Sequence, residues 1–284
     1  MASSRAVLIT GCSSGIGKAT AARLASSDAG WTVYATARNP DKLDDLRAAG
    51  CKTLALDVED EASMKAAVEE VERAEGAVGV LVNNAGYSQS GAVESVPIDK
   101  VRAQFETNVF GLVRMTQLAL PGMRREGAGK VVNVSSMGGR FTFPGGGFYH
   151  ATKHAVEAIS DALRFEVKDF GIDVVLIEPG LIRTNFGDVA VGSIGAGDGD
   201  DPYADFNKAV AEATEDAYEG PVAKFTGGGP DAVAKAIEKA IGARSPRARY
   251  RVTPSAGILI TQRRLMPDRV WDRFLGTQFP RPKA

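Results

Sequence analysis

Short runs of apolar and β-branched residues alternate along the chain with longer segments whose apolar positions recur every three or four residues. Six of the short runs predict strands, at residues 6–10, 31–37, 53–56, 78–83, 130–135 and 172–178. Between them, residues 61–75 place Met64, Val68 and Val71 on one face of a predicted helix. Strands that alternate with helices predict a doubly wound parallel sheet with right-handed crossovers. We therefore expect an α/β fold with three layers, α/β/α.

The regular alternation ends near residue 184. Residues 185–229 are rich in glycine and acidic side chains, and 192–201 has the composition of a flexible loop. Because loops of this length are often functional, we predict a substrate lid at about 185–229. A helix at 230–241, a candidate strand near 250–253 and an apolar, basic segment at 258–275 follow.

The length of 284 residues, without an internal repeat or a convincing linker, fits one domain. We expect a single domain over 1–284, with the lid and a C-terminal extension at about 254–284 as parts of it. Hydrophobic residues make up 44% and charged residues 24%, as in ordinary globular proteins. No run of about 18 apolar residues could span a bilayer, so we expect no integral membrane segment.

The net charge of -1 and the lack of a basic stripe argue against a nucleic-acid partner. Cys12 and Cys51 are the only cysteines, which excludes a disulfide framework and favours a cytoplasmic setting. Charge is nevertheless uneven, because residues 244–284 hold ten Lys or Arg and two Asp or Glu, a net +8. Such a tail is typical of a patch that binds a membrane surface or an acidic partner, but Pro267 interrupts its amphipathic stretch. We favour a solvated or subunit-facing tail.

A glycine-rich turn separates the first predicted strand from an alanine-rich helix at 18–24. The turn reads Thr10-Gly11-Cys12-Ser13-Ser14-Gly15-Ile16-Gly17. Glycines allow a close backbone approach, and free N–H groups at a helix start attract a pyrophosphate. A nucleotide-hydrolysing P-loop is excluded, because five residues separate Gly11 from Gly17 and Ala19 stands where a magnesium-binding hydroxyl is needed.

The second strand indicates which dinucleotide would bind. An acidic residue about 20 positions after the glycine turn would bind the ribose hydroxyls of NAD, whereas an arginine accommodates the 2'-phosphate of NADP. Ala37 stands at that position and Arg38 follows it. We therefore expect NADP(H) in preference to NAD(H), with the alternative that Arg38 only begins a solvated helix.

These residues resemble the short-chain dehydrogenase/reductase family, and the resemblance covers residues 5–184. The turn is similar to the family's T-G-x-x-x-G-x-G, and 83–86 to its N-N-A-G. The resemblance implies a Rossmann-like fold with cofactor contacts at Gly11, Ser13, Ser14, Gly15, Ile16, Gly17, Arg38, Asp57, Val58, Asn84, Ala85, Gly86, Tyr149, Lys153, Pro179, Gly180 and Thr184. It also implies a catalytic tetrad of Asn108, Ser136, Tyr149 and Lys153. Within the family, the run Thr36-Ala37-Arg38-Asn39 and the long C-terminal part resemble hydroxysteroid and retinol dehydrogenase-like members.

The reaction implied is hydride transfer between nicotinamide and a carbonyl or secondary alcohol, which needs a proton donor. Tyr149 and Lys153 are four residues apart and share a face if the segment is helical. A neighbouring ammonium would lower the pKa of the phenol toward the working range. Ser136 would bind the substrate oxygen, with Ser135 as the rival. By resemblance, Asn108 would hold a proton-relay water near Lys153.

His150 and His154 have the spacing of two zinc ligands, but Ala151 stands where the catalytic glutamate of that motif belongs. We expect no metal. Phe141, Phe143 and Phe148 form either an apolar pocket wall or part of the core.

The implied partner is a small carbonyl or alcohol substrate, apolar if the phenylalanines line its pocket. Residues 105–120 and 151–170 are candidate interface helices of a homodimer or homotetramer. Two other functions stay open. One is a sensor or scaffold that binds NADP(H) without turnover, and the other is a lyase or isomerase on the same fold.

Overall fold

The computed structural model describes residues 4–195 and 201–282, and its centre is a seven-stranded sheet in which every pairing is parallel. The strand order is β3-β2-β1-β4-β5-β6-β7. The strands are β1 Ala6–Ile9, β2 Thr32–Ala37, β3 Lys52–Ala55, β4 Val80–Asn83, β5 Gly129–Val134, β6 Ile172–Pro179 and β7 Arg249–Val252. All six predicted strands are confirmed, and the candidate near 250–253 is the seventh.

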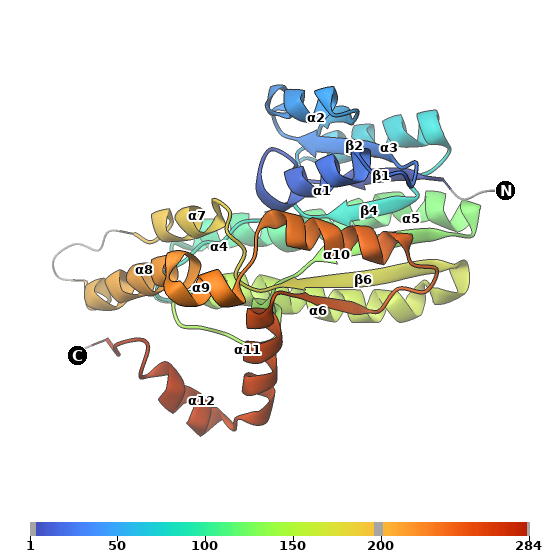
Figure 1. The fold of residues 1–284 in the computed structure, drawn as a ribbon. Coiled ribbons are helices and arrows are strands. Elements are labelled where there is room, and N and C mark those ends of the chain that lie inside the picture. Colours follow the sequence, from blue (N-terminus) through green and yellow to red (C-terminus); the bar gives the residue numbers. More distant parts are fainter. Residues whose placement is uncertain (1–3, 196–200, 283–284) are drawn as a thin grey trace.

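Two apolar clusters lie on opposite faces of the sheet. Val7 and Ile9 of β1 belong to one cluster and Ala6 and Leu8 to the other, as the two-residue period of a strand requires. Such strands, buried on both faces, are typical of doubly wound sheets. Figure 1 shows helices on both sides of the sheet, which confirms the three layers.

Helices connect the strands and extend beyond the sheet. Their bounds are α1 Gly15–Ala25, α2 Asp44–Ala48, α3 Glu61–Glu75, α4 Ile98–Phe105, α5 Leu112–Glu126, α6 Gly147–Glu166, α7 Phe186–Gly192, α8 Ala204–Glu219, α9 Pro221–Thr226, α10 Pro230–Gly242, α11 Pro254–Leu265 and α12 Asp268–Leu275. The predicted helix at 61–75 matches α3, and that at 230–241 matches α10. Among the described residues, no helix is both long and apolar enough to cross a bilayer.

The segment 185–229 is more regular than expected, because α7, α8 and α9 occupy much of it. Its lack of regular structure was therefore a wrong prediction. Phe206 and Val210 give α8 one apolar face, which packs on Ala92. The acidic residues of α8 are exposed, and their number makes the helical period of its few apolar positions hard to recognise in the sequence. Residues 196–200 of the predicted flexible loop lie outside the described part of the chain.

The C-terminal arm, residues 254–282, leaves the sheet after β7. Its two helices end and begin on either side of Pro267, where the sequence predicted an interruption. Figure 1 shows α11 and α12 projecting away from the sheet, with the chain returning toward α8. Ile260 and Trp271 attach the arm by packing against Phe141.

The strand order fixes where a ligand can bind. The chain passes from β1 outward to β2 and β3 and then returns to β4, on the other side of β1. Helical connections therefore diverge beyond the carboxyl ends of β1 and β4. Ligands of doubly wound sheets bind in the crevice at such a switch point.

Candidate active site

The glycine turn after β1 adopts backbone conformations that other residues rarely take. Gly11 has φ +73° and Gly15 has φ +57°. A Cβ on Gly17 would lie 2.3 Å from the carbonyl oxygen of Gly11, so no side chain fits there. Asn84, after β4, holds the turn by donating from Nδ2 to the carbonyl oxygens of Thr10 at 2.9 Å and Gly11 at 3.1 Å.

The turn presents the start of α1 to a cavity of about 650 Å³. Ser14 precedes the helix in an extended conformation, and its side chain does not cap the first turn. N–H groups at an uncapped helix start carry partial positive charge and bind phosphate. Ser13, Gly15 and Ile16 line the cavity beside them. The residues present therefore fit the pyrophosphate of a dinucleotide.

The end of β2 lies in the same cavity. Ala37 and Arg38 both line it, as do Asp57 and Val58 after β3. The Arg38 side chain is exposed and forms no ion pair with another described residue. Asp57 accepts a hydrogen bond from the backbone N–H of Glu59 at 3.0 Å, which stabilises the turn that follows β3. A small residue beside an unpaired guanidinium leaves room for an additional phosphate.

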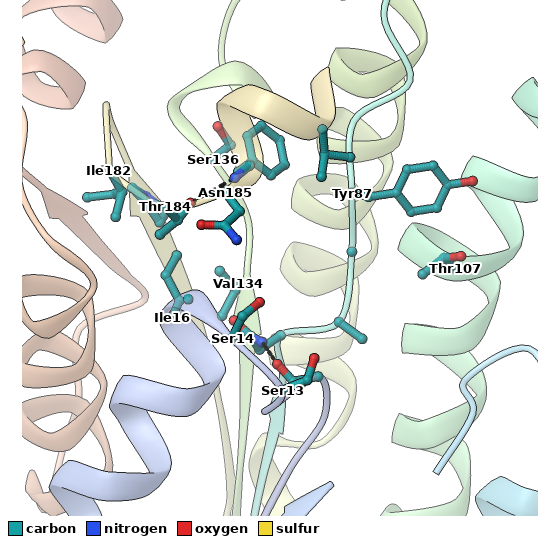
Figure 2. Close-up of a pocket in the computed structure, with 18 of the residues that line it drawn as sticks. Ser13, Ser14, Ile16, Tyr87, Thr107, Val134, Ser136, Ile182, Thr184 and Asn185 are labelled. Carbon is teal, nitrogen blue, oxygen red and sulfur yellow. Dashed lines mark hydrogen bonds between the residues drawn. The ribbon is translucent and has the colours of Figure 1, made fainter. Parts of the chain in front are cut away.

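Tyr149 and Ser136 lie at the far end of the cavity from the glycine turn. Figure 2 shows Ser136 at one end and Ser13 and Ser14 at the other. Tyr149 belongs to the first turn of α6. Burial raises the pKa of its phenol to about 12, and the Ser136 hydroxyl offsets only part of that effect.

Lys153 follows Tyr149 by one helical turn, as predicted. Its ammonium lies 5.8 Å from the centroid of the Tyr149 ring and donates a hydrogen bond of 2.8 Å to the carbonyl oxygen of Val134. Burial lowers the pKa of Lys153 to about 8, although the charge of Glu157 opposes this. We expected the ammonium to lower the pKa of the phenol, and this expectation was wrong for the protein without ligand. Desolvation of both groups outweighs their interaction.

The two adjacent serines face different surroundings. Ser136 caps a short 3-10 helix, Met137–Gly139, by accepting from the N–H of Gly138 at 3.0 Å, and it faces Tyr149. Ser135 is 3% exposed, and its hydroxyl has no hydrogen-bond partner among the described residues. Although both line the cavity, this arrangement favours Ser136 over Ser135 as the substrate-binding hydroxyl.

Asn108 lies in a π-helical turn, Glu106–Gly111, between α4 and α5. Such turns often occur at functional sites. Its Oδ1 accepts from the N–H of Tyr87 at 3.0 Å, and its Nδ2 donates to the carbonyl oxygen of Tyr87 at 2.9 Å and to Thr152 Oγ1 at 3.1 Å. Asn108 thus joins the loop after β4 to α6, while its water-holding role stays a prediction.

The cavity contains most of the residues predicted from the sequence. Those that line it are Gly11, Ser13, Ser14, Gly15, Ile16, Arg38, Asp57, Val58, Asn84, Ala85, Gly86, Ser136, Tyr149, Lys153, Pro179, Gly180 and Thr184. Gly17 and Asn108 lie behind its lining and act through close packing and hydrogen bonds. Glu178 is fully buried beside Pro179 and does not line the cavity.

Sequence reasoning missed the apolar side of the site. Phe186 lies with its ring centroid 5.2 Å from that of Tyr149, and Tyr218 lies 6.5 Å from Phe186. Both come from the predicted lid. Phe141 and Phe143 instead pack against Trp271, at centroid distances of 5.9 and 6.0 Å, away from this cavity. Of the two interpretations of these phenylalanines, packing in the core is confirmed for Phe141 and Phe143, and none of the three, Phe148 included, lines this cavity. The aromatic residues at 186 and 218 carry no motif that would have revealed them.

The two histidines of α6 are directed at backbone carbonyl oxygens. His150 Nδ1 lies 2.9 Å from the oxygen of Gly138, and His154 Nδ1 lies 2.8 Å from that of His150. Within the described ranges, no cluster of three His, Cys, Asp or Glu could hold a metal ion.

Comparisons with known proteins agree with this geometry. The family model described as short chain dehydrogenase matches residues 5–191. A 3-ketodihydrosphingosine reductase from Bacteroides thetaiotaomicron is 37% identical, with 90% of each chain covered. An NADPH-dependent 3-dehydrocapnine reductase from Ornithobacterium rhinotracheale is 37% identical, with 95% of each chain covered. The crystal structure of a short-chain dehydrogenase from Streptomyces avermitilis is 36% identical, with 96% of each chain covered and a TM-score of 0.80.

Proposed function

Because the chain belongs to the short-chain dehydrogenase/reductase family, whose members are NAD(P)-dependent oxidoreductases, we propose that it transfers a hydride between NADP(H) and an apolar ketone or secondary alcohol. One observation carries this proposal. A single cavity of about 650 Å³ joins the phosphate-binding turn at Gly11 and Gly15 to the phenol of Tyr149. A dinucleotide bound to the turn and a carbonyl beside Tyr149 would therefore share one cavity.

When bound, the nicotinamide supplies or accepts the hydride. The residues of the chain manage the oxygen and its proton. Tyr149 donates a proton to the carbonyl oxygen as reduction proceeds, and Ser136 donates a hydrogen bond that strengthens as negative charge develops. In oxidation the same phenol accepts the proton. Because the Tyr149 phenol stays protonated at neutral pH, with its pKa raised to about 12, reduction finds its proton donor in place.

Lys153 positions the reacting groups. Its low pKa, about 8 through burial, keeps part of the population neutral near the working pH. The hydrogen bond from its ammonium to Val134 holds the side chain at the end of β5, beside Ser135 and Ser136. From there it can donate to cofactor hydroxyls without leaving the cavity. Its place one turn from Tyr149 puts its nitrogen 5.8 Å from the centroid of the phenol ring, so both groups can reach the same end of the cavity.

The preference for NADP(H) rests on Ala37 and Arg38. A carboxylate at position 37 would repel a 2'-phosphate, whereas the Arg38 guanidinium suits it and is not held by another described side chain. One relative carries NADPH in its name, which supports the same choice.

The apolar substrate is supported by the side of the cavity opposite the glycine turn. Phe186, Val189 and Tyr218 line it there. All three belong to the segment 185–229, so we propose that this helical segment is the substrate lid. A 3-keto group on a long carbon chain is the substrate class suggested by the relative that is a 3-ketodihydrosphingosine reductase.

We further propose that the chain forms a homodimer or homotetramer in a reducing, cytoplasmic setting. Phe110 and Phe165 are 55% and 88% exposed near α5 and on α6, within the helices expected at a subunit interface. Cys12 and Cys51 are buried free thiols, which suits a reducing compartment.

The test follows NADPH consumption across aldehydes, short ketones, long-chain 3-ketones and steroids. We expect turnover with long-chain ketones, at least about tenfold better in kcat/KM than with short ones. Tyr149→Phe should lower kcat by about a hundredfold or more and leave the Kd for NADPH within about twofold. Tyr203→Phe is the matched control, because its hydroxyl bonds to Glu94 outside the cavity.

Binding of NADPH without turnover of any substrate would instead support the sensor function. Substrate conversion without net NADPH consumption would support a lyase or isomerase. Retention of most activity in a folded Tyr149→Phe variant would remove Tyr149 from its assigned role.

A further inference from the structure

A second cavity lies between the C-terminal arm and the loop at residues 140–147. Its volume is about 860 Å³, which is within the range of small-molecule sites. It shares no lining residue with the catalytic cavity. The family model ends at residue 191, so the arm that forms half of this cavity lies beyond the matched region.

One side of this cavity is apolar and largely aromatic. The rings of Phe143 and Trp271 are stacked, with centroids 6.0 Å apart and an interplanar angle of 25°. Phe141 meets both at steeper angles, and Ile260 and Leu275 extend the same surface. Stacked rings beside aliphatic side chains bury an alkyl chain without leaving polar groups unpaired.

The lining of this cavity is also rich in arginine. Arg140, Arg251, Arg263 and Arg264 line the cavity together with His154, and Asp272 is the one carboxylate among the lining residues. Arg264 is exposed and forms no ion pair with a described residue.

Arg140 lies 3.5 Å from Glu157 and 3.9 Å from Glu178, whereas the guanidinium groups of Arg251 and Arg263 are only partly engaged. Arg251 lies 3.4 Å from Glu178 through Nε alone, and 41% of its side chain is exposed. Arg263 bonds to Asp268 and lies over the Trp271 ring, 5.6 Å from the centroid. Arg264 and Arg251 therefore have N–H groups available to an anion, and the planar guanidinium suits a carboxylate or phosphate.

We propose that this cavity is a second ligand site, which binds an amphiphile with an anionic head group and an unbranched apolar chain. The head group, a carboxylate or a phosphate, meets Arg264 and Arg251, and the chain lies against Phe143 and Trp271. Charge complementarity selects this occupant, since residues 244–284 carry a net +8 in a chain whose net charge is -1. The site would bind such a ligand whether or not the chain reduces ketones.

The same aromatic wall adjoins the catalytic helix. The His150 ring lies 6.4 Å from Phe143 and 5.7 Å from Tyr149, measured between centroids. A ligand on Phe143 would therefore contact a ring that lies near His150, the neighbour of Tyr149. Binding should be measured directly, because this contact can change activity in either direction.

Trp271 is a built-in reporter for the experiment. The chain has two tryptophans, and the other, Trp31, stacks with Arg5 far from the cavity. In a Trp31→Phe background, we would titrate decanoate, decyl phosphate and decanol below their micelle concentrations and record Trp271 emission. The two anions should give saturable changes, with Kd values at least about tenfold lower than decanol, a difference of about 1.4 kcal/mol. Calorimetric titration of the unmodified protein provides a second measurement if Trp31→Phe folds poorly.

Arg264→Glu should raise the Kd of decanoate by at least about tenfold. Arg269→Glu is the matched control, because Arg269 is exposed on the same arm but does not line the cavity. It should change the Kd by no more than about twofold.

Four results would overturn the proposal. Decanol binding as tightly as decanoate would show that the cavity is an apolar surface without a site for the head group. An equal loss of decanoate affinity in the Arg264→Glu and Arg269→Glu variants would show that only the overall charge of the arm matters. Inorganic phosphate binding as tightly as decyl phosphate would mean that no chain is recognised. A response to phosphatidylglycerol vesicles alone would make the arm a membrane-facing surface instead.

Discussion

Glu178 at the end of β6 has no exposed surface, and its Oε1 lies 3.2 Å from Nε of Arg249 on β7. The same Arg249 Nε donates to Glu157 of α6 at 3.0 Å, and its Nη2 donates to Asp161 at 2.6 Å. The Arg249 guanidinium thus joins carboxylates of the catalytic helix to one on the strand that ends at Pro179. Burial and the charge of Glu157 raise the pKa of Glu178, whereas Arg140, Arg249 and Arg251 oppose this.

Arg249→Met should therefore lower the free energy of unfolding by about 3 to 5 kcal/mol, as expected when one partner of a buried ion pair is removed. Arg164→Met is the control, because Arg164 pairs with Asp161 at the surface and should cost no more than about 1 kcal/mol. Adding Glu178→Gln to Arg249→Met should recover part of the loss. Denaturant unfolding measures all three, and equal costs for the two arginines would contradict the assigned role of Arg249.

Cofactor choice should depend on two neighbouring positions. Arg38→Ala should weaken NADPH by about 1.5 to 3 kcal/mol and leave NADH nearly unchanged, because only NADPH offers the 2'-phosphate. Adding Ala37→Asp should invert the preference, since the carboxylate repels that phosphate and accepts from ribose hydroxyls. The measurement is kcat/KM for both cofactors. Arg47→Ala, at an exposed arginine outside the cavity, is the control. Equal weakening of both cofactors by Arg38→Ala would assign Arg38 to the fold.

Acid should destabilise the protein through His150. Burial lowers the pKa of this imidazole from 6.5 to about 4, so the unfolded chain binds the proton more tightly than the folded one. The stabilisation is complete above about pH 6.5 and is lost as the pH falls toward 4, by up to about 3 kcal/mol. His150→Asn, which keeps a donor for Gly138, should remove this part of the pH dependence of unfolding. Parallel pH curves for the two proteins would mean that other groups dominate.

The proposed lid should be among the least stable parts of the fold. In α7 only Gly187 and Ala190 are buried, so little apolar surface holds it. Backbone amides of 186–192 and 204–219 should exchange faster than those of α10 in the free protein, and more slowly once NADPH is bound beside Thr184 and Phe186. Residues 61–75 of α3 serve as an internal control. Equal protection with and without NADPH would make the segment an ordinary packed part of the fold.

The sheet and the polar half of the site were predictable because their signals are local. Each strand is a short β-branched run, and the glycine turn directly follows β1, so backbone constraints appear as residue types at fixed spacing. The pairing of Tyr149 with Lys153 follows in the same way from one turn of a helix.

The apolar half was not predictable, because its residues meet only in the folded chain. Phe186 and Tyr218 come from separate helices and carry no spacing that marks them. Phe141 and Phe143 are near Ser136 in the sequence, which made a wall of the catalytic pocket one of their two interpretations. In the folded chain they pack against Trp271 of the C-terminal arm, away from the catalytic cavity. The raised pKa of Tyr149 was not predictable for a related reason. It results from burial, which depends on the whole fold, whereas the sequence showed only the lysine four residues away.

The position of Arg249 near the end of the chain has a consequence for how the protein folds as it is synthesised. β6 is complete long before β7 leaves the ribosome, yet Glu157 and Glu178 gain the Arg249 guanidinium, and Glu178 also that of Arg251, only when β7 pairs with β6. Until then, burial of β6 and α6 would leave these two carboxylates with Arg140 as their nearby cation, one positive charge against two negative charges. The β6 edge of the sheet should therefore stay open in the nascent chain until Arg249 and Arg251 emerge. A chain whose synthesis stalls before these residues should fold poorly and bind chaperones.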